Sequence, residues 1–172
     1  DGLSNYVPQQ IDGDVATTKL LSSGLLTMGV ERVTGGKKAF INFTQNLLLQ
    51  EIPFLFPKET TVVEVLEDVE PTRDIIQVCK NIKAKGYTIA LDDFVFKEDL
   101  KPLIDLAHII KMDFRLTPVD EIKKYLKMIP VNQIKLLAEK IETNEEFKQA
   151  VDMGFSYFQG YFFCKPQIIS GR

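Results

Sequence analysis

Short apolar segments alternate with amphipathic segments along most of the chain. The apolar runs are rich in β-branched and aromatic residues, which favour buried β-strands. They cover residues 39–43, 61–66, 87–91, 107–112, 133–138 and 155–161. Because these runs are almost continuously apolar, they are typical of parallel strands that are covered on both faces.

Apolar residues recur every three or four positions between the strands, which predicts helices. Pro71 suits the first turn of one helix, Gly86 its C-terminal end, and Asn144 the N-cap of another that Gly154 ends. A first helix begins near Asp14. The other predicted helices cover residues 45–51, 100–106 and 118–128.

The alternation of strands and helices predicts a parallel sheet covered by helices. Two architectures fit this pattern, an open doubly wound sheet and a (β/α)₈-type barrel. Glycine-rich phosphate loops do not follow the strands, which weighs against a dinucleotide-binding sheet.

Polar residues recur at the C-terminal ends of the predicted strands. They are Asn42, Glu64, Asp92, Asp93, Lys111 and Glu139, and Gln159 lies in the last predicted strand. In a barrel these side chains converge on the mouth where catalysis occurs. The alternative is that each is an isolated polar residue, solvated at the rim.

Carboxylate and amide oxygens are hard ligands that suit Mg²⁺, Mn²⁺ or Ca²⁺ better than zinc. A nearby lysine could hold a water or a phosphate oxygen, and a further glutamate could act as a general base. This combination is typical of metal-assisted hydrolysis of a phosphoester.

The chain has 172 residues, and its 45% hydrophobic and 26% charged content predicts one globular domain over residues 1–172. A net charge of −3 gives no sign of binding to a nucleic-acid polymer. The apolar runs are far shorter than the ~20 residues of a membrane span. Two cysteines, no signal peptide and no initial Met predict a domain excised from a longer cytoplasmic protein.

Six short motifs occur in an order that resembles the EAL domain, the bacterial cyclic di-GMP phosphodiesterase family. The resemblance covers nearly the whole chain. The motifs are Phe40-Ile41-Asn42-Phe43-Thr44, Val63-Glu64-Val65-Leu66-Glu67, Leu91-Asp92-Asp93-Phe94, Ile110-Lys111-Met112-Asp113, Ala138-Glu139-Lys140-Ile141-Glu142-Thr143 and Gln159-Gly160-Tyr161-Phe162-Phe163-Cys164-Lys165-Pro166.

The resemblance implies a (β/α)₈ TIM-like barrel, incomplete at its N-terminus, with one antiparallel strand. It also implies roles for eight residues. Asn42, Glu64 and Asp92 would bind a first Mg²⁺ or Mn²⁺ and Asp93 a second, Lys111 would hold the water, Glu139 would be the base, Gln159 would help the site, and Glu67 would support the loop after Asp93.

Three features depart from the family pattern. The namesake Glu-Ala-Leu segment, expected just before Asp1, is absent. Residues 95–99 replace a glycine-rich loop that organises the metal pair and the dimer interface in active members. Lys140 replaces a glycine. These departures resemble the divergent branch in which an EAL domain precedes an HDOD domain and activity is often lost.

Two functions therefore stay open. One is a degenerate domain that binds cyclic di-GMP or another protein and regulates, with a neighbouring HDOD-type domain as partner. The other is an active phosphodiesterase that opens cyclic di-GMP to the linear dinucleotide pGpG. A missing first strand leaves a sheet edge that proteins cover, and we expect a second copy of the chain in a homodimer, a partner chain or the N-terminal segment to cover it.

Overall fold

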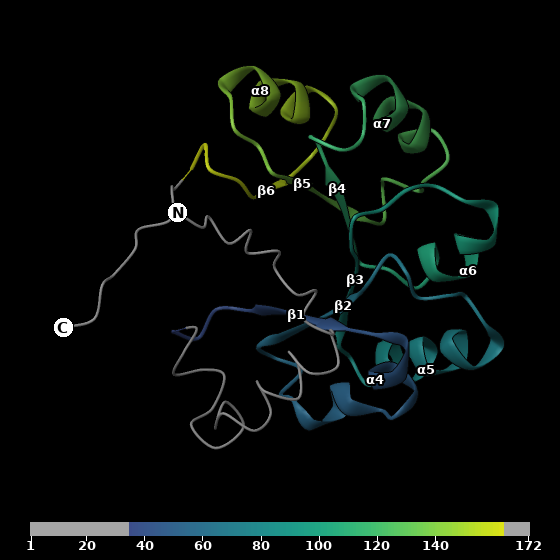
Figure 1. Ribbon diagram of the computed structural model, residues 1–172. Coiled ribbons are helices and arrows are strands. Elements are labelled where there is room, and N and C mark those ends of the chain that lie inside the picture. The colour runs from purple at the N-terminus through teal and green to yellow at the C-terminus, as the bar shows by residue number, and fades with distance from the viewer. Residues whose placement is uncertain (1–34, 164–172) are drawn as a thin grey trace, which may run out of the picture.

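The computed structural model describes residues 35–163, which form a parallel six-stranded sheet in the order β1-β2-β3-β4-β5-β6 (Figure 1). Every pairing between neighbouring strands is parallel. The antiparallel strand implied by the family resemblance does not occur among these residues. The strands are β1 (Ala39–Phe43), β2 (Thr61–Val65), β3 (Thr88–Leu91), β4 (Ile109–Asp113), β5 (Lys135–Glu139) and β6 (Tyr157–Phe158).

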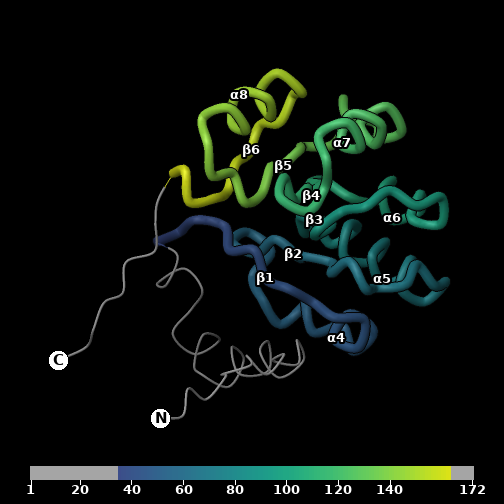
Figure 2. Tube along the Cα trace, turned by 45° about the horizontal axis from the view of Figure 1, so that its top comes forward, coloured from purple at the N-terminus to yellow at the C-terminus, as the bar shows by residue number. Residues whose placement is uncertain are grey.

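The helices lie on the outer side of the curved sheet, and each connects one strand to the next (Figure 2). This confirms the predicted alternation within the described part of the chain. The α-helices are α4 (Gln45–Leu49), α5 (Arg73–Ala84), α6 (Lys101–Ile104), α7 (Val119–Leu126) and α8 (Asn144–Asp152), and two 3₁₀ turns are η1 (Ile52–Leu55) and η2 (Glu98–Leu100). The predicted helix that begins near Asp14 lies outside the described residues.

Two predicted helix starts are wrong by one or two residues. The N-cap of α5 is Thr72, whose hydroxyl accepts the N–H of Ile75, so Pro71 lies outside the helix. The N-cap of α8 is Thr143, which forms a capping box with Glu146. A threonine hydroxyl, like an asparagine side chain, can accept an orphan N–H of the first turn. The predicted glycine at the end of α5 is confirmed, because Gly86 has a φ of 87°.

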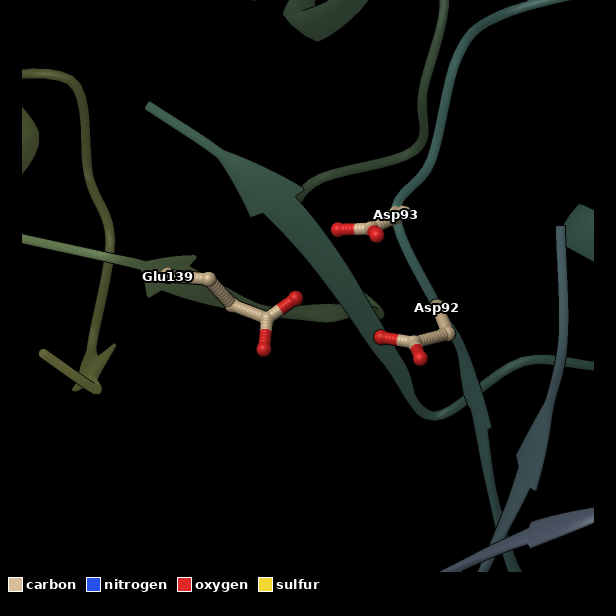
Figure 3. A group of neighbouring side chains, drawn as sticks. All are labelled: Asp92, Asp93 and Glu139. Atoms are coloured by element: carbon tan, nitrogen blue, oxygen red, sulfur yellow. The ribbon is translucent and has the colours of Figure 1, made fainter. Parts of the chain in front are cut away.

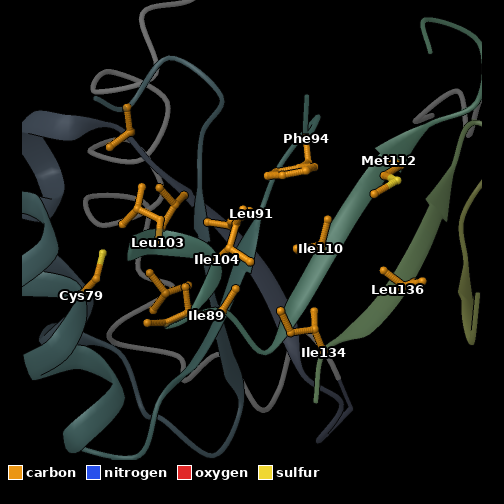
Figure 4. Close-up of a cluster of buried hydrophobic side chains, with 14 of the residues drawn as sticks. Cys79, Ile89, Leu91, Phe94, Leu103, Ile104, Ile110, Met112, Ile134 and Leu136 are labelled. Atoms are coloured by element: carbon orange, nitrogen blue, oxygen red, sulfur yellow. The ribbon is translucent and has the colours of Figure 1, made fainter. Parts of the chain in front are cut away.

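The main core lies between the sheet and the helices (Figure 4). Alternate residues of each strand point to this side, as Ile89 and Leu91 do on β3 and Ile110 and Met112 do on β4. They pack against helix residues such as Cys79, whose thiol has a pKa raised to about 11 by burial. This packing fixes the strands and therefore the positions of their C-terminal ends.

The other face of the sheet carries two layers of side chains. A small apolar cluster is formed by Val62, Ala90, Ile109 and Leu137, all buried. Two residues further along each strand, on the same face, the side chains are ionisable. Those residues are Glu64, Asp92, Lys111 and Glu139.

The last strand is shorter than the sequence predicts. Only Tyr157 and Phe158 pair with β5, so Gln159 follows the strand instead of lying within it. Its N–H still donates to the carbonyl oxygen of Ala138, at 2.8 Å. None of the described helices combines the length and apolar character that a membrane crossing requires.

Candidate functional site

The backbone holds Asp92 and Asp93 between two neighbouring strands. The N–H of Asp92 donates to the carbonyl oxygen of Val65 on β2, at 2.9 Å. The N–H of Phe94 donates to the carbonyl oxygen of Lys111 on β4, also at 2.9 Å. The ladder thus continues past the end of β3, and both carboxylates are placed at the mouth that the strand ends form.

Lys111 lies at the centre of the charged layer. Its ammonium donates to Glu64 and, at 2.6 Å, to Oδ1 of Asp92, and it lies 3.0 Å from Oε1 of Glu139. Burial alone would lower the pKa of this lysine, but the hydrogen bonds to Asp92 and Glu64 raise it well above its usual range. Lys111 therefore stays charged at neutral pH.

Three carboxyl groups at this site resist ionisation. Burial raises the pKa of Glu139 to about 7, against the lowering effect of Lys111. Burial also raises the pKa of Glu64 and, with help from the negative charge of Asp92, that of Asp93. A carboxyl that changes protonation near neutral pH is suited to proton transfer.

A second lysine, Lys140, lies beside the site just after β5. Lys140 donates to the buried carboxylate of Asp113 and lies 3.9 Å from Oδ1 of Asp93. Asp113 also accepts the N–H groups of Arg115 and Leu116. Burial would raise the pKa of Asp113, but these hydrogen bonds lower it below its usual value.

The donor set fits a hard divalent cation. Asp92, Asp93 and Glu139 each offer an oxygen atom, and the three atoms lie within 4.8 Å of one another. Figure 3 shows the three carboxyl groups turned toward a common space. Oε2 of Glu139 is buried and has no hydrogen-bond partner among the described residues. An orphaned carboxylate oxygen beside two further carboxylates could bind Mg²⁺, Mn²⁺ or Ca²⁺, or could accept a proton from a water at such an ion.

The remaining predicted residues surround this group. Asn42 is exposed and lies opposite Glu64 in the β1–β2 register. Glu67 is exposed and lines a cleft of about 330 Å³ together with Asp92 and Asp93. Gln159 lines a second cleft, of about 490 Å³, together with Glu139 and other residues.

Glycine is required at position 160, which lines the second cleft. A Cβ atom at this position would lie 2.1 Å from the carbonyl oxygen of Ile141, far inside van der Waals contact. The N–H of Ile141 donates to the carbonyl oxygen of Gln159, at 3.0 Å. This close approach of two backbones fixes Gln159 beside the strand end that carries Glu139.

Beside the charged layer lie two charged residues to which the sequence prediction gave no role, Asp113 and Lys140. Asp113 lies two residues after Lys111 on β4, so it shares the face that carries the site. That spacing is the signal that could have identified it. Lys140 enters the site through the turn after β5, where its φ is 56°. The strand pattern alone does not indicate that turn.

Comparison with known proteins identifies the family. Residues 36–166 match the model of the EAL domain. The chain is 44% identical over 166 residues to the uncharacterized protein YuxH of Bacillus subtilis, covering 94% of this chain and 41% of YuxH. It is 35% identical over 174 aligned positions to the cyclic di-GMP phosphodiesterase CdgJ of Vibrio cholerae, covering 100% of this chain and 40% of CdgJ. The chain belongs to the EAL domain family.

A solved structure confirms the architecture. The EAL-domain protein YkuI of Bacillus subtilis, in complex with its substrate cyclic di-GMP and calcium, has a TM-score of 0.66 and 18% sequence identity, covering 98% of this chain and 46% of YkuI. The fold is therefore the TIM-like α/β fold of EAL domains, as the sequence predicts. The chain spans about 40% of the length of the two curated relatives.

Proposed function

We propose that this chain is a cyclic di-GMP signalling domain that binds the dinucleotide at the charged strand ends and hydrolyses it only slowly. Membership of the EAL family supports the signalling assignment. The relative CdgJ is a cyclic di-GMP phosphodiesterase, and YkuI has been solved with cyclic di-GMP and calcium. The acidic group of this chain offers the matching chemistry for a cation that accompanies a phosphate.

The charge of each residue determines the role that we propose for it. Asn42, Glu64, Asp92 and Asp93 would hold the cation, which when bound would neutralise the phosphate and lower the pKa of a bound water. Lys111 remains protonated and would orient that water or a phosphate oxygen. Glu139, with its pKa of about 7, would take the proton.

The packing of the segment after Asp93 is the observation that supports slow hydrolysis. Asp93 has a φ of 36°, and the next residues contain no glycine. Phe94 is buried, and Phe96 packs on Phe94 and stacks on Tyr125 of α7, with ring centroids 6.5 and 6.4 Å apart. Aromatic packing against α7 therefore anchors this segment, which limits how far it can move to hold a cation and a substrate in the geometry that hydrolysis requires.

Two measurements on the 172-residue chain test this function. Calorimetric titration with cyclic di-GMP in the presence of Ca²⁺ should show binding that Asp92→Asn weakens. Asp152→Asn is the matched control, because Asp152 is an exposed carboxylate at the end of α8. Chromatography after incubation with Mg²⁺ or Mn²⁺ should show turnover far below ~1 s⁻¹, the lower end of the ordinary enzyme range. Absence of binding would contradict the proposal.

An active phosphodiesterase is the second candidate, and the state of Glu139 favours it. A buried glutamate with a pKa of about 7 and an unpartnered oxygen is well placed for general-base catalysis. Formation of the linear dinucleotide pGpG at ~1 s⁻¹ or faster, abolished by Glu139→Gln, would establish this candidate in place of the first.

We also propose a wider setting for the chain. We expect a neighbouring HDOD-type domain in the full-length protein, a homodimer and a cytoplasmic location. Static light scattering of the 172-residue chain tests the dimer, because a dimer doubles the mass of 19.6 kDa.

A further inference from the structure

Lys140 occupies a backbone position that an L-residue with a side chain adopts at a cost. Its φ of 56° lies in the left-handed region, where Cβ crowds the following carbonyl oxygen. Glycine avoids this crowding, whereas a residue with a Cβ atom is strained there. The turn therefore does not itself favour a lysine, and the contacts of the side chain must be considered.

The side chain brings a positive charge to the outer half of the acidic group. Its ammonium pairs with Asp113, whose side chain is 2% exposed, and lies 3.9 Å from Oδ1 of Asp93. Asp93 is also one of the three residues whose oxygens lie within 4.8 Å of one another. A cation that binds Asp93 must therefore share it with Lys140.

The charge balance shows what Lys140 changes. Five carboxylates, those of Glu64, Asp92, Asp93, Asp113 and Glu139, face the two ammonium groups of Lys111 and Lys140. When all are ionised, negative charge exceeds positive charge by three, and a single divalent cation leaves an excess of one. Without the charge of Lys140 the excess is four, which two divalent cations balance.

We propose that Lys140 is a tethered cation that limits this site to one divalent ion and weakens the affinity for that ion. This inference rests on the cation site of the proposed function and concerns the selectivity of that site. The ammonium satisfies Asp93 and Asp113 in place of a second metal ion. It also repels an ion bound by Asp92 and Asp93.

Substitutions at position 140 separate the charge from the backbone. Lys140→Gln removes the charge and keeps a long side chain, Lys140→Arg keeps the charge, and Lys140→Gly removes both the charge and the crowding. Glu51→Gly is the matched control, because Glu51 is an exposed residue with the same φ of 56° in another loop. It should relieve the backbone cost without changing the binding of cations.

Calorimetric titration with Mn²⁺ alone, with free Mn²⁺ counted by electron paramagnetic resonance, tests the proposal without any turnover. The unchanged chain, Lys140→Arg and Glu51→Gly should bind one ion. Lys140→Gln and Lys140→Gly should bind a second ion and should bind the first about tenfold more tightly, as Coulomb's law gives for a single and a double charge at ~7 Å in water.

A second set of variants protects the test against misfolding, because removing Lys140 leaves Asp113 buried without its ammonium partner. Asp113→Asn alone and together with Lys140→Gln should both fold, and the double variant should bind Mn²⁺ about tenfold more tightly than Asp113→Asn, since the same repulsion is removed. The unchanged chain could bind Mn²⁺ with the same stoichiometry and affinity as Lys140→Gln, and Asp113→Asn with the same stoichiometry and affinity as the double variant. That result would overturn the role of Lys140 but not the cation site. Absence of Mn²⁺ binding in every variant would overturn the cation site of the proposed function as well.

Discussion

The inner face of the sheet shows two layers that differ sharply although only two residues separate them along each strand. The lower layer, Val62, Ala90, Ile109 and Leu137, is apolar and buried. The upper layer, Glu64, Asp92, Lys111 and Glu139, is held together by ion pairs around one ammonium group. The same strands and the same pairing register support both layers.

The two layers contribute to folding in opposite ways. Burial of the apolar layer stabilises the fold by about 25 cal/mol for each Å² of apolar surface removed from water. The upper layer places carboxylates where burial opposes their charge, so the pKa values of Glu64 and Glu139 are raised. The lower layer therefore stabilises the fold regardless of pH, whereas Glu64 and Glu139 of the upper layer, the proposed cation site, become less favourable to stability as they ionise.

The largest effect is expected when the central cation of the upper layer is removed. Lys111→Met leaves Glu64, Asp92 and Glu139 without their shared partner. We expect a loss of about 4 kcal/mol in the free energy of unfolding at pH 8, since an uncompensated buried charge is costly. Denaturant unfolding should show a smaller loss at pH 5, where the carboxyl groups take up protons. An equal loss at both pH values would contradict the charge argument.

A substitution in the lower layer should behave differently. Leu137→Ala removes a buried side chain that is 5% exposed, and we expect a loss of about 3 kcal/mol from lost transfer energy and the remaining cavity. Because no ionisable group is changed, this loss should be the same at pH 5 and pH 8. A strong pH dependence would show that the two layers are coupled.

The sequence predicted the parts of this arrangement that depend on local pattern. Alternating apolar runs identified all six described strands, and the polar residues that end them identified Glu64, Asp92, Asp93, Lys111 and Glu139 as neighbours. The i+2 spacing on a strand determines the face, and parallel strands bring their C-terminal ends together. Both properties can be seen without coordinates.

Other features depend on tertiary contacts and could not be predicted in the same way. The aromatic run 155–161 suggested a long strand, but Phe155 packs on Phe114, and Phe162 and Phe163 pack on Phe147 of α8. The strand itself ends at Phe158, although the backbone of Gln159 still hydrogen-bonds to Ala138 and Ile141. The pairing of Lys140 with Asp113 likewise depends on a left-handed turn that no periodicity indicates.

A smaller effect is expected when the base candidate is neutralised. The pKa of Glu139 is raised to about 7 in the folded chain, so the folded state binds more protons than the unfolded state between about pH 4.5 and pH 7. Stability therefore falls as the pH rises through this window. We expect Glu139→Gln to remove this dependence and to increase the free energy of unfolding at pH 8 by ~2 kcal/mol.

Unfolding curves of the unchanged chain and Glu139→Gln at pH 5 and pH 8 measure this effect. Asp152→Asn is the control, because it neutralises an exposed carboxylate outside the upper layer. We compare the change in the free energy of unfolding from pH 5 to pH 8 between the two proteins. If this change were more positive for the unchanged chain than for Glu139→Gln, the predicted fall in stability with rising pH would be wrong.

We propose that the upper layer carries an excess of buried negative charge and that a bound divalent cation relieves it. Thermal unfolding of the 172-residue chain at pH 7.5 with increasing Mn²⁺ tests it most directly. The account predicts that the midpoint of the unchanged chain rises by several degrees, since a ligand at 100 times its Kd adds about 2.7 kcal/mol. It predicts almost no rise for Asp92→Asn. Equal rises in both proteins, or no rise in the unchanged chain, would contradict it.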